Sequence, residues 1–308
     1  MKILVTGGLG AVGGPLVTSL RALGHEVWVL DRPHHHGLNG QFYFRGDVGE
    51  YRQVERVFDQ VPFDFVYHAA AEFGRINGEH FYETMWRSNA VGTKNLIRLQ
   101  EARRFRMVVF SSSEIYGDFD GVMTEDLPDR HPIQQMNDYA ISKWVNELQV
   151  RNSAAVAGTE TVIVRLFNTY GPGEPYSEYR SVVCKFIYSA LHGLPYRVYL
   201  GHHRTSSYID DTVRTLSAIA SSFKPGAVYN IAGERYHDIK TISDMILRQV
   251  GRDDSIVEYV EYESHNTRDK KSSAARAKAD LGHRETVDLE EGIARTIAWQ
   301  RTYYGVIG

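Results

Sequence analysis

The sequence predicts an α/β protein in which a doubly wound parallel sheet is joined to a smaller C-terminal α/β lobe. Three observations lead to this fold class. An apolar N-terminal run enters a glycine-rich turn, strand and helix patterns alternate up to about residue 168, and shorter mixed elements follow. Val- and Ile-rich strands that alternate with helices form parallel sheets covered on both faces, and right-handed crossovers wind such sheets. We therefore expect a first domain over residues 1–168 and a second lobe over residues 169–308, with some segments crossing back.

The first strand is expected over residues 2–6, where an apolar run leads into a turn of the form Gly-x-x-Gly-x-x-Gly. A strand that ends in such a turn places the N-terminus of the next helix against a diphosphate. Gly7 makes the tight turn, Gly10 lets the backbone approach the phosphates, and Gly13 lets the helix pack closely on the sheet. The residues expected at the diphosphate are Gly7, Gly10, Ala11, Val12 and Gly13.

The second strand is expected over residues 25–30 and ends in Asp31. An acid at this point, about 20 residues beyond the glycine turn, hydrogen-bonds the ribose diol of NAD and repels the 2′-phosphate of NADP. Arg32 follows directly, and its positive charge would weaken that preference. We therefore expect NAD as the cofactor.

The remaining elements continue the alternation and then change in character. In the first part, the expected strands cover residues 41–48, 64–68, 106–110 and 160–167, and the expected helices cover residues 50–60, 79–101 and 138–156. Beyond residue 168, the expected strands cover residues 196–200, 227–231 and 255–262, and the expected helices cover residues 210–223, 241–250 and 289–303. The shorter, mixed elements of this second part indicate a smaller lobe.

The composition restricts the possible partners. The 308 residues carry a formal net charge of −3, which offers no general basic surface for nucleic acid or an anionic membrane. No apolar run approaches the roughly 20 residues of a membrane span, and no signal peptide is recognisable. The single cysteine, Cys184, rules out an internal disulfide and fits the cytoplasm. The consecutive histidines at 34–36 cannot converge on one ion, so we expect no metal site.

A second pattern places a phenol and an ammonium group on one helix face. Tyr139 and Lys143 are four residues apart within the expected helix 138–156, so both can point into one site. A free tyrosine keeps its proton to about pH 10, and a nearby lysine with a positively charged nicotinamide ring would favour the phenolate. The serines at 111–113 lie at the carboxyl end of the expected strand 106–110, where ligands bind in open α/β sheets. A hydroxyl there can pass a substrate proton to the tyrosine.

Together these motifs resemble the extended short-chain dehydrogenase/reductase family, in particular its nucleotide-sugar epimerase/dehydratase branch. The resemblance extends over nearly the whole chain. The matching segments are residues 6–13, 46–48, 68–71, 89–93, 112–117, 139–143, 165–172 and 204–211. It implies a Rossmann-like domain that binds NAD and a nucleotide-diphosphate sugar as the substrate.

The resemblance also implies roles for individual residues. Counting back from Tyr116, the catalytic hydroxyl of the family falls on Ser112, with Ser111 as the alternative, and Tyr139 is the catalytic base. The residues implied on the cofactor side are Asp47 and Val48 at the adenine, Ala69 and Ala70 along the cleft, Asn89 as a support, and Lys143 at the nicotinamide ribose. The residues implied on the substrate side are Ser112, Ser113 and Glu114 near the sugar, Asn168 and Arg204 at the diphosphate, and Arg180 and Arg268 in the nucleotide pocket.

Members of this family begin by oxidising a sugar carbon, usually C4, and differ in the later steps. A 4-epimerase lets the 4-keto sugar rotate and returns hydride to the other face. A dehydratase also needs a base at C5 and an acid for the C6 hydroxyl, and a decarboxylase needs a C6 carboxylate. The segment Ser112-Ser113-Glu114 resembles the Thr-Ser-Glu of uronate decarboxylases and GDP-mannose-type dehydratases, which would give Glu114 a catalytic role. The alternative is a structural role, in which Glu114 caps a turn or orients Tyr116. Ser113 stands where dTDP-glucose dehydratases have the acid that protonates the leaving hydroxyl.

We expect a NAD-dependent nucleotide-sugar 4-epimerase that acts through a transient 4-keto intermediate. The alternatives are a decarboxylase or a 4,6-dehydratase that uses Glu114, and, in a different class, a non-catalytic NAD-binding scaffold protein. Asp31 argues against a net reductase, which would usually draw on NADPH. The resemblance further implies a homodimer that pairs the expected helices 79–101 and 138–156 in a four-helix bundle.

Overall fold

The computed structural model describes residues 1–33, 42–261, 263 and 265–306, so the histidines at 34–36 lie outside the described residues. The chain forms two compact units. The first consists of Met1–Ile115, Asn137–Arg165 and Val213–Tyr229, and the second consists of Tyr116–Met136, Leu166–Thr212 and Asn230–Gly308. Relative to the expected boundary at residue 168, residues 116–136 therefore belong to the second unit and residues 213–229 to the first.

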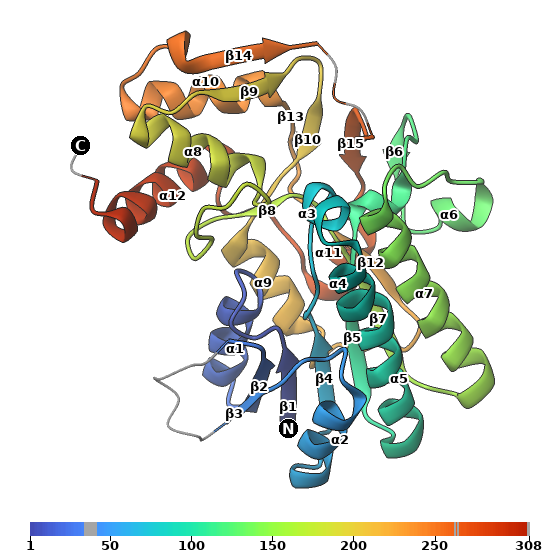
Figure 1. Cartoon of the computed structure of the whole chain (residues 1–308). Helices are drawn as coiled ribbons and strands as arrows, with labels where there is room; N and C mark the ends of the chain where they lie inside the picture. The colour runs from blue at the N-terminus through green and yellow to red at the C-terminus, as the bar shows by residue number, and fades with distance from the viewer. Residues whose placement is uncertain (34–41, 262, 264, 307–308) are drawn as a thin grey trace. The chain divides into compact units, whose positions relative to one another are not determined.

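The first unit is built around a seven-stranded sheet, whose strand order is β12-β7-β5-β4-β1-β2-β3. The strands are β1 (Lys2–Thr6), β2 (Glu26–Asp31), β3 (Tyr43–Arg45), β4 (Phe65–His68), β5 (Arg106–Ser112), β7 (Thr161–Leu166) and β12 (Val228–Ile231). β1 pairs in parallel with both β2 and β4, and Val5 lies between Val29 and Tyr67 in the register. Strands β2 and β3 extend the sheet to one side of β1, and β4 and β5 extend it to the other (Figure 1). This reversal of order beside β1 is the point at which open α/β sheets bind ligands.

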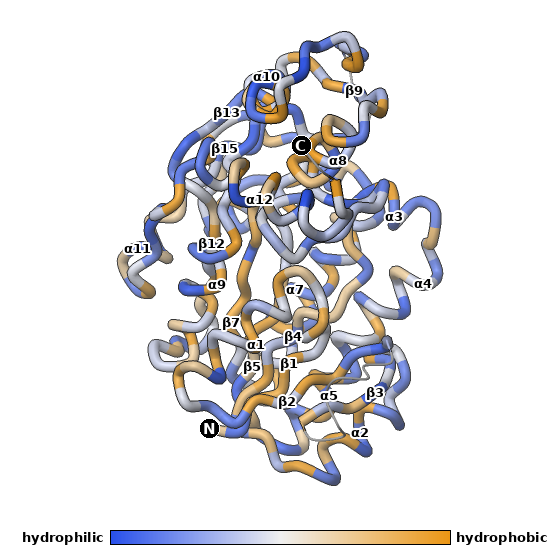
Figure 2. The backbone as a smooth tube through the Cα atoms, turned by 90° about the vertical axis from the view of Figure 1, so that its left-hand side faces the viewer, coloured by the Kyte–Doolittle hydropathy of each residue, from blue (hydrophilic) through white to orange (hydrophobic). Residues whose placement is uncertain are grey.

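Helices cover this sheet because its strands are apolar on both faces. The helices are α1 (Gly13–Ala22), α2 (Tyr51–Gln60), α5 (Gly92–Arg103), α7 (Asp138–Ala157) and α9 (Ile209–Ala218). One core cluster joins Leu4 and Val66 of the sheet to Val54 of α2 and Leu96 of α5. Figure 1 shows α2, α5 and α7 on the same face, and Figure 2 shows β1, β2 and β4 as largely apolar segments. The doubly wound α/β fold expected from the sequence is confirmed.

The single helix expected over residues 79–101 is wrong. The structure has α3 (Arg75–His80), α4 (Tyr82–Trp86), a π-helical turn over Arg87–Val91, and then α5. Phe81 separates the first two helices with φ −128° and ψ 52°, which lie outside the helical region. The π-helical turn inserts an extra residue into the helix, which is a feature often found at functional sites.

The second unit is built from small sheets and helices. Its four-stranded sheet has the order β13-β10-β15-β6, and two further pairs join β11 to β8 and β14 to β9. The strands are β6 (Val122–Met123), β8 (Thr169–Tyr170), β9 (Tyr196–Tyr199), β10 (His203–Thr205), β11 (Ser207–Tyr208), β13 (Tyr236–Asp238), β14 (Val257–Val260) and β15 (Asp269–Ser272). The helices are α6 (Leu127–Arg130), α8 (Val182–His192), α10 (Ile239–Val250), α11 (Ala275–Leu281) and α12 (Leu289–Tyr304), with a 3-10 turn at Asp254–Ile256. A further 3-10 turn, Ser113–Tyr116, begins in the first unit.

One strand that the sequence analysis grouped with the smaller lobe has a different place. The segment expected at 227–231 is β12, which extends the large sheet beside β7. Its hydrogen bonds explain the position, because Ile163 donates its backbone N–H to Ala227 and Phe167 donates to Ile231. Among the described residues, no helix is long and apolar enough to cross a membrane, and no group of three potential metal ligands converges.

Candidate active site

The turn after β1 has the shape that the glycine pattern predicts. Gly7 has φ +72°, and a Cβ atom there would come within 2.7 Å of the backbone nitrogen of Ala70. A Cβ atom on Gly13 would overlap the carbonyl oxygen of Gly7, whereas one on Gly10 would meet only that oxygen, at 3.2 Å. No side chain caps the N-terminus of α1 at Val12. The backbone N–H groups of Gly7, Leu9 and Gly10 are already hydrogen-bonded within the protein, so the donors that fit a diphosphate are those at the uncapped N-terminus of α1.

Asp31, at the end of β2, is fixed beside this turn. Its Oδ2 accepts a hydrogen bond from the backbone N–H of Leu9 at 2.9 Å, and its Oδ1 accepts one from Arg32 at 2.8 Å. Both donors are backbone groups, so the carboxylate is held against the glycine turn and can still accept hydrogen bonds from a ribose diol. The glycines of the turn and the uncapped N-terminus of α1 fit a diphosphate, and this carboxylate fits the ribose of an ADP-ribose unit.

The other residues expected on the cofactor side lie in the first unit. Asp47 Oδ1 accepts the N–H of Gly49 at 2.8 Å, and Val48 is buried, with its carbonyl bound by Asn95 Nδ2 at 2.9 Å. The backbone nitrogen of Ala69 donates to Thr6 O at 3.1 Å, and that of Ala70 donates to Thr6 Oγ1 at 3.3 Å. The segment after β4 is thereby held next to the glycine turn.

Asn89 lies in the π-helical turn and is 1% exposed. Its side chain accepts the backbone N–H of Glu72 at 2.9 Å and donates to the carbonyl of the same residue at 2.9 Å. It also donates to Ser142 Oγ at 3.0 Å. Asn89 therefore connects the segment after β4 to α7, the helix that carries Tyr139 and Lys143.

The structure distinguishes the two serines at the end of β5. The Ser111 hydroxyl donates to Glu147 Oε1 at 2.5 Å, inside a buried group of side chains. The Ser112 side chain is instead hydrogen-bonded to Tyr139, and its oxygen also accepts the backbone N–H of Glu114 at 3.2 Å. Only Ser112 thus has its hydroxyl directed to the tyrosine, which favours it over Ser111 as the catalytic hydroxyl.

Tyr139 and Lys143 lie close together on α7. Their side chains are 8% and 4% exposed, and the lysine Nζ lies 5.8 Å from the centre of the tyrosine ring. Lys143 Nζ donates to the carbonyl of Phe110 at 2.9 Å. Burial lowers the pKa of Lys143 to about 8. Burial also raises the pKa of the Tyr139 phenol, and although the Ser112 hydrogen bond acts against this, the negative charge of Glu114 adds to it.

This pKa direction differs from the expectation that the site favours the phenolate. Desolvation opposes the charged form of a buried phenol, and here it outweighs the stabilising contacts made by the protein. The expectation also counted on the positive charge of a nicotinamide ring. The protein groups alone keep Tyr139 neutral.

The residues expected around the substrate belong to both units. Ser112, Ser113 and Glu114 are in the first unit, where Ser113 is 4% exposed and begins a 3-10 turn with Glu114. Asn168, Arg180, Arg204 and Arg268 are in the second unit.

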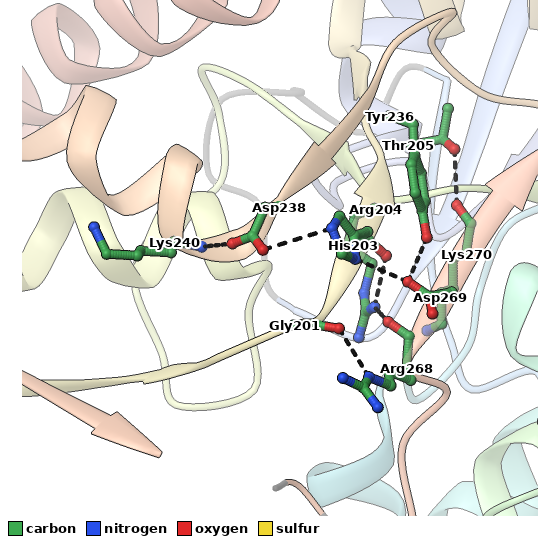
Figure 3. A network of polar contacts seen from close by, with 10 residues as sticks. All are labelled: Gly201, His203, Arg204, Thr205, Tyr236, Asp238, Lys240, Arg268, Asp269 and Lys270. Carbon is green, nitrogen blue, oxygen red and sulfur yellow. Dashed lines mark hydrogen bonds and ion pairs between the residues drawn. The ribbon is translucent and has the colours of Figure 1, made fainter. Parts of the chain in front are cut away.

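Within the second unit, Arg204 and Arg268 form one polar network (Figure 3). Arg204 is on β10 and is 5% exposed, and its Nη1 donates to the carbonyls of His203 and Arg268, both at 2.8 Å. Arg268 Nε donates to the carbonyl of Gly201 at 3.0 Å. Both acceptors are neutral backbone carbonyls. These two hydrogen bonds therefore position the Arg204 guanidinium without neutralising its positive charge.

Asn168 and Arg180 lie on two loops of the second unit. Asn168 has φ +35°, a left-handed conformation that is uncommon outside glycine, and its buried Oδ1 has no hydrogen-bond partner. A buried unpartnered oxygen in a strained residue suggests a group that a ligand completes. Arg180 precedes α8 and donates its backbone N–H to Ser177 at 3.2 Å.

Sequence reasoning missed two buried groups of the first unit. His68, which ends β4, lies between the hydroxyls of Thr6 and Thr93. Arg165 on β7 forms two hydrogen bonds to Glu147 on α7, at 3.0 and 2.7 Å, and both side chains are fully buried. Glu147 lies four residues after Lys143 on the same face of α7, and this spacing was the sequence signal that could have drawn attention to Glu147.

Comparisons with known proteins agree with this geometry. A family model described as the NAD dependent epimerase/dehydratase family matches residues 3–232. UDP-glucuronic acid decarboxylase 1 from Xenopus tropicalis is 30% identical over 311 residues, covering 97% of this chain and 72% of that protein. The dTDP-glucose 4,6-dehydratase of Actinoplanes sp. is 28% identical over 322 residues, covering 98% of both chains. The structure of Thermus thermophilus UDP-glucose 4-epimerase in complex with NAD has a TM-score of 0.88 and 26% identity, covering 98% of this chain and 99% of that chain.

The matches confirm the resemblance that the motifs suggested and the NAD cofactor that it implied. They include a decarboxylase, a dehydratase and an epimerase at similar identity. The chain belongs to the NAD-dependent epimerase/dehydratase family.

Proposed function

We propose that this protein is a NAD-dependent 4-epimerase of a nucleotide-diphosphate sugar, acting through a transient 4-keto intermediate. The observation that carries the proposal is the hydrogen bond between Tyr139 and Ser112, with the ammonium group of Lys143 beside them. A phenol, a hydroxyl and a cation in this arrangement can remove a proton from a sugar hydroxyl and later return it. NAD, when bound, would accept the hydride from the sugar and later return it.

The proton is handled by residues of the chain. Ser112 hydrogen-bonds the oxygen on C4 and relays its proton to Tyr139 as the carbon is oxidised. Below its pKa of about 8, Lys143 is protonated, and its charge stabilises the phenolate while that proton is transferred. Because burial favours the neutral phenol, Tyr139 is well suited to hold the proton and return it when the ketone is reduced. Reduction on the opposite face of the rotated sugar completes epimerisation, with no net consumption of cofactor.

Ser113 supports epimerisation over dehydration. Elimination of water from C5 and C6 needs an acid to protonate the leaving hydroxyl, and a serine hydroxyl has too high a pKa to do this efficiently near neutral pH. Oxidation and reduction at C4 need no such acid. The groups that are present, Ser112, Tyr139 and Lys143, therefore suffice for a 4-epimerase.

A second candidate is decarboxylation of a nucleotide-linked uronic acid, and Glu114 favours it. The motif Ser112-Ser113-Glu114 retains a carboxylate close enough to Tyr139 to raise the pKa of the phenol. A relative that is 30% identical is named a UDP-glucuronic acid decarboxylase. Oxidation at C4 of a uronic acid gives a β-keto acid, which loses CO₂ readily. The same first step would then lead to a different product.

We assign recognition of the nucleotide diphosphate to the second unit. The guanidinium of Arg204 is anchored by two carbonyls and offers the planar donors that suit phosphate oxygens. Asn168 would contact the same diphosphate through its side-chain NH₂, because its buried Oδ1 accepts hydrogen bonds and ionised phosphate oxygens donate none. Arg180 and Arg268 remain our candidates for the nucleotide pocket.

Replacing Tyr139 by Phe tests the proposal. We expect kcat to fall by about 10²- to 10⁴-fold because proton transfer is lost, while the affinity for NAD changes less than threefold. Tyr303→Phe, at a position that is 56% exposed on α12, is the matched control and should leave both unchanged. Unchanged turnover of Tyr139→Phe on a nucleotide sugar would refute the mechanism.

We also propose a homodimer that pairs α5 and α7 of two copies. Ile141 and Leu148 are seven residues apart on α7 and are 38% and 46% exposed, and Val156 further along is 80% exposed. Residues with this spacing form an apolar stripe on one helix face, as in a four-helix bundle. Leu148→Glu should convert a dimer to a monomer in sedimentation velocity, and a wild-type monomer would refute this proposal.

A further inference from the structure

Two cations lie next to the carboxylate that recognises the cofactor ribose. Arg32 follows Asp31 in the chain, and Arg45 on β3 is paired with Asp31 in the register of β2 and β3. A guanidinium near this position is the group that accommodates the 2′-phosphate of NADP. The presence of two arginines therefore works against the selectivity for NAD that Asp31 provides, unless the charge of one is already engaged.

The structure shows that Arg32 is engaged. Its Nη2 donates to Glu72 Oε1 at 2.7 Å, across the end of β1. Arg32 follows β2 and Glu72 follows β4, and these strands flank β1 on its two sides. The ion pair therefore directs the guanidinium from the end of β2 to the segment that follows β4, on the other side of β1.

Glu72 is the fixed member of the pair. Its side chain is 15% exposed, compared with 51% for Arg32. Its Oε2 accepts Asn77 Nδ2 at 3.0 Å, and its backbone N–H and C=O are both bound by Asn89. The flexible arginine thus binds to a carboxylate that is held in place by neighbouring groups.

We propose that Glu72 is a specificity-determining residue, which enforces selection of NAD over NADP by holding Arg32 in an ion pair. To bind a 2′-phosphate, Arg32 would have to leave a charge-assisted hydrogen bond to Glu72, and the carboxylate left behind would add negative charge near the ligand. Both effects weaken NADP binding and leave NAD, which has a hydroxyl at that position, nearly unaffected. This role is separate from the sugar chemistry, because it concerns binding of the cofactor alone.

The test is the ratio of dissociation constants for NADP and NAD, measured by isothermal titration calorimetry without any sugar. Glu72→Gln removes the charge and keeps an amide oxygen for Asn77, so the local fold should be retained. We expect NADP to bind about tenfold more tightly to this variant, with NAD affinity changed less than twofold, since a charge-assisted hydrogen bond is worth about that factor or more. An unchanged ratio in a variant that unfolds at the wild-type temperature would overturn the proposal.

A double variant tests whether Glu72 acts through Arg32. In an Arg32→Met background, Glu72→Gln should give no tighter NADP binding. The same tenfold gain in that background would show that Glu72 acts by simple repulsion, and would refute the proposal. In an Arg45→Met background the gain should persist. Glu258→Gln, which breaks the exposed Arg197–Glu258 pair of the second unit, is the matched control and should change neither constant.

Discussion

His68 offers a quantitative test of how the first unit is built. The imidazole is 3% exposed and lies between Thr6 Oγ1, 2.8 Å from Nδ1, and Thr93 Oγ1, 3.1 Å from Nε2. Burial lowers its pKa from 6.5 to about 3, and the positive charge of Lys143 contributes in the same direction. The folded protein therefore keeps this ring neutral at pH values where the unfolded chain protonates it.

The sign and size of the effect come from these two pKa values. As the pH falls below 6.5, the unfolded state binds a proton at His68 and the folded state does not, so stability is lost until the pH approaches 3. The loss is about 1.4 kcal/mol per pH unit in this window. Between pH 7 and pH 5 the contribution of His68 to the free energy of unfolding should therefore fall by about 2 kcal/mol.

Urea denaturation at pH 7 and pH 5 measures this loss for the wild type and for His68→Gln, whose amide can still hydrogen-bond one threonine. We expect the wild type to lose about 2 kcal/mol more than the variant over this range. His131→Gln, at an exposed position, should behave like the wild type. Equal losses in the wild type and His68→Gln, or a His68 ring signal that titrates near pH 6 in NMR spectra, would refute the reasoning.

Two further predictions concern the buried groups behind the site. Arg165→Met should lower the free energy of unfolding by about 3–5 kcal/mol, because the buried Glu147 carboxylate loses its two short hydrogen bonds to a guanidinium and keeps the Ser111 hydroxyl and the more distant Arg151, at 3.9 Å. The double change Glu147→Met with Arg165→Met should recover most of that loss in urea denaturation, and a single change that costs less than about 1 kcal/mol would contradict this. Ser112→Ala should lower kcat at least about 100-fold, whereas Ser111→Ala should reduce stability and lower kcat less than tenfold, and the reverse pattern in steady-state assays would move the catalytic role to Ser111.

Much of the first unit was predictable because its signals are local. The apolar run of β1, the glycine turn and Asp31 occur in an order that only a strand-turn-helix unit explains, and the structure has each in its expected place. The tyrosine and lysine share α7, as their helical spacing predicts, although that spacing carried weight in the sequence only together with the serines at 111–113.

Other features depend on contacts between distant segments. The helix expected over residues 79–101 breaks at Phe81, and its later π-helical turn places Asn89 against the backbone of Glu72, a contact that no local pattern encodes. The place of β12 beside β7 depends on pairing between strands that are more than 60 residues apart. The choice of Ser112 over Ser111 rests on Glu147, which lies 36 residues beyond Ser111 in the sequence. The pKa of Tyr139 depends on the extent of burial, which spacing does not reveal.

The central claim is that this chain epimerises a nucleotide sugar at C4. The most direct measurement is mass spectrometry, with chromatographic separation, of the products formed by the purified protein from a panel of UDP-, GDP-, dTDP-, CDP- and ADP-sugars without added NADPH. We expect a product of unchanged mass and shifted retention from at least one sugar. Loss of CO₂ or of water would contradict the claim in favour of a decarboxylase or a dehydratase that uses Glu114. No change with any sugar would contradict it in favour of a non-catalytic NAD-binding protein.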